Sequence, residues 1–363
     1  MSHPLNQIPK GLTNLGNTCF LNACVQVLSQ TIELTKIPHP PPQKEGSPEH
    51  TFFLAWKDLN EFLLMGDSNV AIISPNTFVH TVHKIAQIKD RTLFTGFAQN
   101  DVSEFLLFFI DCLHDAIKKS MKINIRGTAM NETDKLAVEC YKMIENKFEK
   151  EYSEIMELFY GVSVSSLTTI GTGSDGTGSD ISSLTKGKIL TVNPEFFFML
   201  DLPIPTENGS SYDIYSCLDA YVSPELLENE DAWYNEETKM KESVYKTISF
   251  WNFPNILVIS FKRFEVINSR FIRKHNGLIS FPETLDLSKY VVGYQPSSYI
   301  YDLYGVCNHS GDVMGGHYTS FVKTQYNKWF YCNDTGIEQV NSPEQIITPM
   351  AYCLFYRKKN NFV

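Results

Sequence analysis

The chain contains no C-x-x-C pair, because its eight cysteines are scattered through 363 residues. A structural zinc site therefore has no visible ligand set, since such sites are built from closely spaced cysteine and histidine pairs. The first ten residues, MSHPLNQIPK, are polar and contain proline, unlike a signal peptide. Scattered cysteines without a leader favour a reducing, intracellular compartment and free thiols over a disulfide framework.

Two further absences narrow the function. No run of eighteen or more apolar residues is present, so a membrane-spanning helix is not expected. Positive charge is in deficit, and the net charge of -10 argues against nucleic-acid binding as the default. This acidic balance suits a basic or neutral protein partner, although solubility alone also explains it. Hydrophobic residues make up 43% of the chain, enough for one elaborated domain or two.

Helical patterns come first and strand patterns later, which is the order of an α+β protein. Helices are predicted at 18–30, 100–119 and within 132–159, where apolar residues recur at the spacing of one helical face. Strands rich in aromatic and β-branched residues are predicted at 255–264, 299–310, 317–324, 328–334 and 351–358.

Two intervening segments lack the pattern of either element. Residues 163–187 contain GTGSD twice in tandem and too few apolar side chains to pack. This segment is predicted to be a flexible hairpin tip or linker. The charged segment 228–242, ENEDAWYNEETKMKE, is predicted to be a second loop.

Two cysteines lie close together in GLTNLGNTCFLNACVQVLSQ, residues 11–30, and metal binding, a disulfide, packing and catalysis are all possible for them. Asn17 and Thr18 stand where a helix N-cap belongs, so Cys19 lies at the first helical turn. A helix N-terminus favours a thiolate through its positive potential and free N–H groups. Cys24 lies more than a turn further on, along the apolar face. The pattern favours Cys19 as a nucleophile and Cys24 as a core residue.

A cysteine nucleophile needs a base, which a third group usually orients. Strand patterns at 318–324 and 328–333 flank a short turn and predict a β-hairpin. If Tyr326 is the centre, facing residues have numbers that sum to about 652, which brings His317 next to Asp334. This spacing predicts a catalytic His–Asp pair, and an ordinary surface pair at a hairpin end would share it.

Five motifs together carry a resemblance to a known family. GLTNLGNTCFLNACVQ resembles the cysteine box of the ubiquitin-specific proteases, the papain-like deubiquitinases, and GGHYTSFVK followed by WFYCNDTGIEQV resembles their histidine box. GFAQNDVSEFLLFFIDCLH, PNILVISFKRF and AYCLFYRK are similar to intervening blocks in the same order. The resemblance implies one papain-like catalytic domain, with a helical thumb at about 1–158, fingers at about 159–250 and a palm sheet at about 251–363.

The resemblance also implies a thiol hydrolase that cleaves the isopeptide or peptide bond after the C-terminal glycine of ubiquitin. Cys19 would attack the carbonyl, His317 would act as base and then acid, and Asp334 would orient His317. Asn14 would stabilise the oxyanion together with the Cys19 backbone N–H. Asparagine in TNLGN is also a common turn residue, so both interpretations of Asn14 stand.

Four further residues match family positions that would bind substrate. Asp101 and Glu104 would contact the basic tail of ubiquitin, although D-x-x-E at a helix start is also a capping-box pattern. One of the two could cap while the other binds, and the pattern does not assign which. Gly315 and Gly316 would let the diglycine tail pass beside the Cys19 helix, where a side chain would clash.

The family's zinc-binding pairs would fall near Thr169, Thr172, Asn235 and Thr238, where hydroxyl and amide groups are poor zinc ligands. We therefore expect no metal and no cofactor. Because the fingers of the family normally grip the globular part of ubiquitin, the altered tip leaves room for a protease of another Gly-Gly-tailed modifier. A catalytically silent ubiquitin-binding scaffold is a further alternative.

The resemblance implies ubiquitin and ubiquitinated proteins as partners, together with a possible regulatory protein. It implies neither nucleic acid nor a membrane as a partner. The expected location is the cytoplasm, the nucleus or both.

Overall fold

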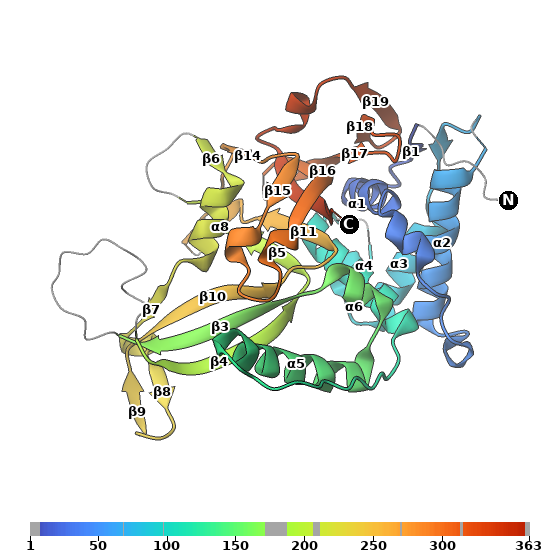
Figure 1. The fold of residues 1–363 in the computed structure, drawn as a ribbon. Helices are drawn as coiled ribbons and strands as arrows, with labels where there is room; N and C mark the ends of the chain where they lie inside the picture. The colour runs from blue at the N-terminus through green and yellow to red at the C-terminus, as the bar shows by residue number, and fades with distance from the viewer. Residues whose placement is uncertain are drawn as a thin grey trace.

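The computed structural model describes residues 8–67, 69–96, 98–170, 187–205, 211–268, 271–312 and 315–359. Helices dominate the first part of the chain, which forms the thumb at one side of the molecule (Figure 1). The α-helices are α1 (Cys19–Ser29), α2 (Pro48–Met65), α3 (Asn76–Ile88), α4 (Val102–Ile117), α5 (Glu132–Glu151), α6 (Glu154–Phe159) and α8 (Ile214–Val222). Short 3-10 helices are η1 (Ile32–Lys36), η2 (Pro42–Lys44), η3 (Thr92–Phe94), η4 (Asn229–Asp231), η5 (Ser288–Tyr290), η6 (Pro296–Ser298) and η7 (Pro343–Ile346).

The palm is one large, mostly antiparallel sheet of order β19-β18-β17-β16-β20-β11-β5, with β15 also pairing with β16. Its strands are β5 (Met199–Leu202), β11 (Ile256–Phe261), β15 (Thr284–Asp286), β16 (Ile300–Gly311), β17 (Gly316–Lys323), β18 (Trp329–Asn333), β19 (Gly336–Val340) and β20 (Ala351–Lys358). The thumb and the palm meet along α1, which lies beside β17 and β16 (Figure 1).

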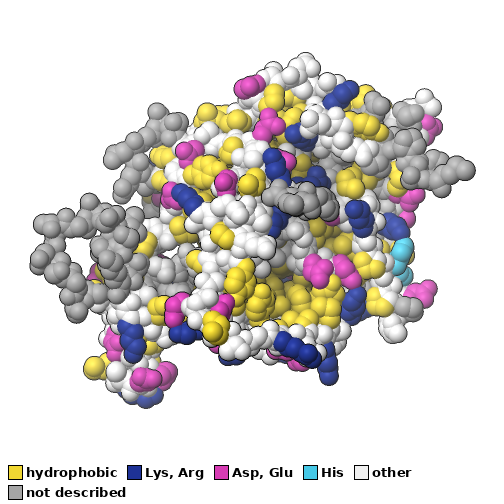
Figure 2. All heavy atoms as spheres, in the orientation of Figure 1, with side chains coloured by type: hydrophobic (Ala, Val, Ile, Leu, Met, Phe, Trp, Pro, Cys, Tyr) yellow, Lys and Arg dark blue, Asp and Glu magenta, His cyan; other side chains and the backbone are white. Residues whose placement is uncertain are grey.

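The fingers are a four-stranded sheet of order β4-β3-β10-β7, which extends away from the thumb (Figure 1). Its strands are β3 (Gly161–Thr169), β4 (Ile189–Phe197), β7 (Glu225–Leu227) and β10 (Val244–Asn252). The remaining strands form two-stranded pairs: β1 (Gly11–Leu12) with β2 (Ile72–Ile73), β6 (Ser211–Asp213) with β14 (Leu278–Ser280), β8 (Trp233–Asn235) with β9 (Met240–Glu242), and β12 (Phe264–Asn268) with β13 (Phe271–Lys274). Figure 2 shows hydrophobic side chains gathered just above α5, where α6 and the fingers sheet lie.

Helix α1 is the central element of the core, since all eleven of its residues are buried. It is enclosed by the thumb helices and the palm sheet, and its side chains belong to the same hydrophobic cluster as those of α2, α3 and α4. The helix predicted at 100–119 is confirmed as α4, and its apolar face is buried: Val102, Phe105, Leu106, Phe109, Leu113, Ala116 and Ile117. A nucleophile on α1 is therefore held by a fully buried helix.

The predicted hairpin register is confirmed, because Ser320 pairs with Cys332 and Lys323 with Trp329, pairs whose numbers sum to 652. The pairing does not continue to residue 335. Asp334 adopts a left-handed conformation with φ of 48°, and the chain turns there into β19. The open end of the hairpin therefore differs from the extrapolated geometry.

Two sequence predictions about the fingers region need correction. Residues up to Thr169 are not a flexible tip, because β3 pairs along its length with β4 and β10; residues 171–186 of the predicted tip lie outside the described part. The charged segment 228–242 is not a loop throughout, since it forms the β8–β9 hairpin. The helices predicted within 132–159 are confirmed as α5 and α6, which are separated where Ser153 caps α6 by accepting the N–H of Met156.

Candidate active site

Cys19 is the first residue of α1 and is 4% exposed. Thr18 occupies the N-cap position as predicted, but its side chain makes no capping bond to the helix. Its hydroxyl accepts the N–H of Leu15 at 2.9 Å instead. The Asn14 side-chain oxygen accepts the backbone N–H of Thr18 at 3.2 Å and that of Gly16 at 3.0 Å. Asn14 thus organises the turn that leads into α1.

The electrostatics of Cys19 differ from the sequence prediction. Burial raises the pKa of the Cys19 thiol above its ordinary value, and the negative charge of Asp334 raises it further. A hydrogen bond from the Tyr318 backbone N–H lowers the pKa, as do the N–H groups at the start of α1, but these effects do not compensate for burial. The N–H groups at the helix end favour the thiolate as expected, but burial outweighs them and the pKa of Cys19 is raised overall.

His317 lies on β17, directly before Tyr318, whose N–H faces the Cys19 sulfur. Its Nε2 lies 2.7 Å from Oδ1 of Asn333, the last residue of β18. Because an amide oxygen only accepts, this bond places a proton on Nε2 and leaves Nδ1 as the basic nitrogen. Asn333 is thus the residue that fixes the tautomer and orientation of the imidazole in the structure.

Asp334 faces a different set of partners. Its carboxylate accepts the Asn14 side-chain N–H at 3.0 Å and the Asn22 side-chain N–H at 2.8 Å. Its backbone oxygen accepts the N–H of Leu12 at 2.8 Å. Among the hydrogen bonds of the described residues, none joins Asp334 to His317. The structure therefore brings Asp334 to the predicted oxyanion donor, Asn14, and leaves its predicted role beside His317 as a prediction.

The two predicted acidic substrate contacts are not equivalent. Asp101 caps α4, since one carboxylate oxygen accepts the N–H groups of Ser103 and Glu104 at 2.7 and 3.3 Å. Its other oxygen accepts the hydroxyl protons of Tyr352 at 2.7 Å and Tyr318 at 3.3 Å. The Glu104 side chain is exposed and makes no hydrogen bond or ion pair to the described residues. Partial burial, and then the charge of Asp101, raise its pKa.

Gly315 and Gly316 lie at the start of β17, beside the thumb. The Gly316 N–H donates to the side-chain oxygen of Gln99 at 2.6 Å, which ties the palm to the loop before α4. A Cβ on Gly316 would collide with the His309 ring, so glycine is required there by the protein's own packing. A Cβ on Gly315 would make an ordinary contact with Gln99.

A cleft of about 330 Å³ lies beside these glycines. It is lined on the thumb side by Gln99 and Asp101 and on the palm side by His309, Tyr318 and the β12–β13 hairpin. Burial, and then the nearby Lys274 ammonium, lower the pKa of His309 to about 4, so its ring is neutral at physiological pH. The cleft therefore lies at the thumb–palm boundary, and Tyr318 in its lining directly follows His317.

The positions expected to carry zinc ligands in related proteins are hydrogen-bonded instead. Asn235 and Thr238 lie in the β8–β9 hairpin, and both donate to one carboxylate oxygen of Glu242, at 2.9 and 2.7 Å. Thr169 ends β3, and Thr172 lies outside the described residues. Within the described ranges, no cluster of three or more histidine, cysteine, aspartate or glutamate side chains could hold a metal ion.

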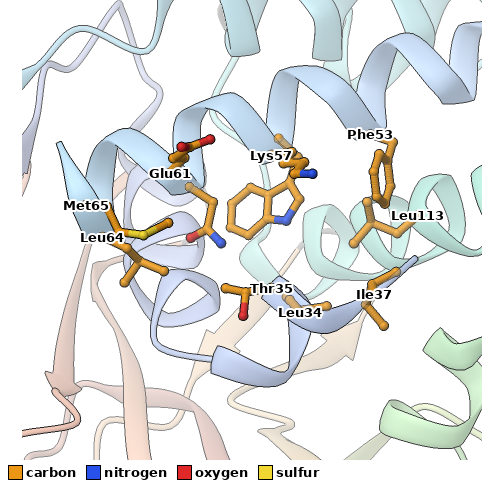
Figure 3. Close-up of a pocket in the computed structure, with 11 residues that line it drawn as sticks. Leu34, Thr35, Ile37, Phe53, Lys57, Glu61, Leu64, Met65 and Leu113 are labelled. Carbon is orange, nitrogen blue, oxygen red and sulfur yellow. The ribbon is translucent and has the colours of Figure 1, made fainter. Parts of the chain in front are cut away.

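All eight cysteines are free and buried, and burial raises the pKa of Cys24 well above its ordinary value. A smaller pocket of about 90 Å³ lies on the thumb, where Leu34 and Ile37 face Phe53 of α2 (Figure 3). None of the candidate catalytic residues lines it. No helix in the described part of the chain is long and apolar enough to cross a membrane.

Sequence reasoning missed three residues that the structure places at the site: Asn333, Asn22 and Gln99. Asn333 is two positions from residue 335, which the predicted register places opposite His317, and such diagonal neighbours in a hairpin remain within reach. Asn22 lies three residues after Cys19, a spacing that puts both on one side of a helix, and this signal was available. Nothing in the sequence marks the contact of Gln99 with Gly316.

Comparisons with known proteins identify the family of the chain. The model of the family described as "ubiquitin carboxyl-terminal hydrolase" matches residues 10–356. The chain is 30% identical over 366 residues to ubiquitin carboxyl-terminal hydrolase Usp2 of Drosophila melanogaster, an alignment covering 96% of this chain and 34% of the relative. It is 29% identical to human ubiquitin carboxyl-terminal hydrolase 2, covering 95% of this chain and 54% of the relative. The chain thus spans about half or less of these relatives.

The fold is shared with solved structures. Ubp8 in the SAGA DUB module with Sgf11, Sus1 and Sgf73, bound to ubiquitin aldehyde, matches with a TM-score of 0.69 and 22% identity, over 99% of this chain and 72% of that one. The same module bound to monoubiquitin matches with a TM-score of 0.70 and 21% identity, with the same coverage. At this level of identity the likeness shows the fold.

Proposed function

Because this chain belongs to the ubiquitin carboxyl-terminal hydrolase family, we propose that it is a cysteine-type deubiquitinase that hydrolyses the bond after the C-terminal glycine of ubiquitin. The observation that carries the proposal is the position of Cys19. It opens the buried helix α1, and its sulfur accepts the N–H of Tyr318, the residue next to His317. Nucleophile and base are thus held on two elements that pack directly against each other.

The chemistry follows from these groups. Nδ1 of His317 takes the proton of the Cys19 thiol, and the thiolate attacks the carbonyl carbon of the last glycine. The tetrahedral intermediate carries a negative oxygen, which the Asn14 amide and the Cys19 backbone N–H stabilise. The imidazolium then protonates the leaving amine, and a thioester forms on Cys19. Water, deprotonated by His317, hydrolyses the thioester and releases ubiquitin.

The adjacent residues Asn333 and Asp334 have different roles in this scheme. Asn333 orients His317, as its 2.7 Å bond to Nε2 supports. Asp334, which the sequence pattern assigned to His317, serves the oxyanion side through its 3.0 Å bond to Asn14. Asp334 therefore acts on catalysis through Asn14 rather than through the base.

Glu104 is the residue proposed to meet the basic tail of ubiquitin. Its neighbour Asp101 has both carboxylate oxygens engaged in capping α4 and in accepting tyrosine hydroxyls. Glu104 is exposed at the same helix end, so its carboxylate can receive a basic side chain. Gly316 contacts Gln99 and lies against His309, two residues that line the cleft of about 330 Å³, so the diglycine tail would lie extended beside Gly315 and Gly316.

The raised pKa of Cys19 supports a requirement for activation. Ubiquitin or a regulatory protein would have to bring the His317 ring toward the sulfur before the thiolate becomes abundant. In a structural neighbour, Ubp8 is assembled with Sgf11, Sus1 and Sgf73.

We propose a cytoplasmic or nuclear location for the chain, which the eight free cysteines support.

The test uses ubiquitin with an electrophile in place of its C-terminal carboxylate, with a parallel set made from other Gly-Gly-tailed modifiers. Intact-mass measurement is expected to show one ubiquitin adduct on the wild-type chain. The adduct should disappear in Cys19→Ala and persist in Cys24→Ala, the matched control on the same helix. Ubiquitin binding without an adduct would favour a silent scaffold, and an adduct with another modifier only would favour a different protease.

A further inference from the structure

Asn22 is a buried polar residue of α1 that neither the motifs nor the mechanism has used. It is 2% exposed and lies three residues after Cys19. Its side-chain N–H donates to the Asp334 carboxylate at 2.8 Å, and its nitrogen lies 3.4 Å from the carbonyl oxygens of Leu12 and Thr13. Its own oxygen has no partner among the described residues. The bond to Asp334 is thus the strongest contact this side chain makes.

The Asp334 carboxylate is shared between two amides. One oxygen accepts from Asn22 and the other from Asn14, at 2.8 and 3.0 Å. Asn22 and Asn14 thereby fix the plane of the carboxylate from two sides. A carboxylate held on one side only would be free to rotate about its last torsion angle, which is broad for aspartate.

Asn14 is in turn fixed at both ends. Its oxygen accepts the backbone N–H groups of Gly16 and Thr18, and its nitrogen donates one proton to Asp334. An asparagine amide carries two N–H donors, and no described residue accepts the second one of Asn14. The bond to Asp334 therefore selects which way the remaining donor points.

We propose that Asn22 is a positioning residue that aims the oxyanion donor: it holds Asp334, and Asp334 holds Asn14. The inference rests on the proposed function, in which Asn14 stabilises the developing oxyanion. If Asn22 has this role, one helix positions both the nucleophile and the oxyanion donor, since Cys19 and Asn22 both belong to α1. Donors that are aligned before the reaction need no reorganisation when the charge develops, which is the basis of their effect on kcat.

Gln26 provides a matched control one turn further along α1. It is also 2% exposed, its amide donates to the Lys10 carbonyl oxygen at 2.7 Å, and its own oxygen also lacks a partner among the described residues. Asn22→Leu and Gln26→Leu each remove one buried amide from the same helix. Their thermal unfolding midpoints should fall together, so a difference in kcat between them reports the contact with Asp334.

The experiment measures hydrolysis of ubiquitin carrying a C-terminal fluorophore. Asn22→Leu is expected to lower kcat about tenfold with KM within twofold, and Gln26→Leu to leave kcat within twofold. In an Asn14→Ala background, Asn22→Leu should cost less than twofold more. In an Asn333→Ala background, which affects the base, the tenfold factor should remain. Equal losses in all backgrounds, or an equal loss in Gln26→Leu, would overturn the proposal. Asn22→Ser is the second variant if Asn22→Leu does not fold.

A readout without turnover separates this inference from the proposed function. The side-chain amide resonances of Asn14 can be assigned by their loss in Asn14→Ala. Asn22→Leu should change their shifts and raise their hydrogen-exchange rate at least tenfold, while Gln26→Leu leaves both unchanged. Unchanged resonances in Asn22→Leu would refute the positioning role. If Asn22→Leu changes the Asn14 resonances as expected, but the wild-type chain forms no ubiquitin adduct and shows no turnover, the proposed function alone is refuted.

Discussion

The two halves of the proposed catalytic site, the oxyanion side and the base side, are held very differently. On the oxyanion side, the Asn14 side chain is fixed by two backbone N–H groups and by Asp334, which Asn22 and Leu12 hold in place. On the base side, the one hydrogen bond that joins the His317 ring to the described residues goes to Asn333, and the ring is partly exposed.

This difference indicates where the site changes when substrate binds. The oxyanion half is part of the packed boundary between α1 and the palm, so it is assembled before substrate arrives. The base half can move without breaking the core, because among the described residues only the bond to Asn333 must adjust. Activation of the Cys19 thiol, whose pKa is raised, is therefore expected to come from movement of the base.

The largest loss of activity is expected when the proposed base, His317, is removed. His317→Ala is expected to lower kcat at least ~10³-fold, because no other described group takes over proton transfer at the sulfur. KM and the thermal midpoint should change little, since the ring is at the edge of the core. Steady-state kinetics with fluorogenic ubiquitin measure this. Retention of more than a tenth of wild-type kcat would exclude His317 as the base.

Removing the oxyanion donor is expected to have the next largest effect. Asn14→Ala should lower kcat by ~10²–10³-fold, the usual cost of losing one such donor, with little change in KM. Gln26→Leu, which removes a buried amide from α1 without touching Asn14, serves as the control and should retain kcat within twofold. If Asn14→Ala mainly raises KM or lowers the thermal midpoint, its turn role is the whole of its function.

Removing the charge of Asp334 is expected to make Cys19 react faster with a small alkylating reagent and to make ubiquitin hydrolysis slower. The charge raises the pKa of Cys19, so Asp334→Asn should lower that pKa and increase the thiolate fraction at neutral pH. Alkylation of Cys19 by iodoacetamide at pH 7.5 should become severalfold faster, while ubiquitin hydrolysis becomes slower. Alkylation of the wild-type chain should continue to accelerate above pH 9. Glu104→Gln is the matched acidic control, and slower alkylation of Asp334→Asn would contradict the geometry.

The smallest expected effect sharpens the comparison at the substrate end. Glu104→Gln should raise KM a few-fold at low salt and less at high salt, with kcat unchanged, because the contact is between exposed charges. Since the pKa of Glu104 is raised, its charge is lost at a higher pH than that of an ordinary glutamate. The wild-type KM should therefore rise as the pH falls, and that of Glu104→Gln should not. Identical pH dependence of both would remove Glu104 from the binding site.

Much of this fold could be predicted because it depends on periodic patterns. The buried stripe of α4 and the register of β17 with β18 follow from spacings of 3.6 and 2 residues, which the sequence states directly. The position of Cys19 at the start of α1 follows from the same reasoning. The family resemblance rests on motifs that coincide with these elements.

The partners of Asn333 and Asp334 could not be predicted in this way. Extrapolating the hairpin assumes that the strand continues, but Asp334 takes a left-handed φ of 48° and leaves the ladder. A local backbone angle thus decides which of two adjacent side chains reaches His317. The pKa of Cys19 was also beyond a local pattern, since it depends on burial by distant parts of the chain.

The central claim is that Asn333 serves the base and Asp334 serves the oxyanion donor. It is tested most directly by measuring kcat for fluorogenic ubiquitin in Asn333→Ala and Asp334→Ala, each alone and combined with Asn14→Ala. The account predicts that Asp334→Ala costs less than twofold once Asn14 is absent, whereas Asn333→Ala keeps its full effect. If Asp334→Ala keeps its full effect and Asn333→Ala loses its own, the two roles are reversed and the account is contradicted.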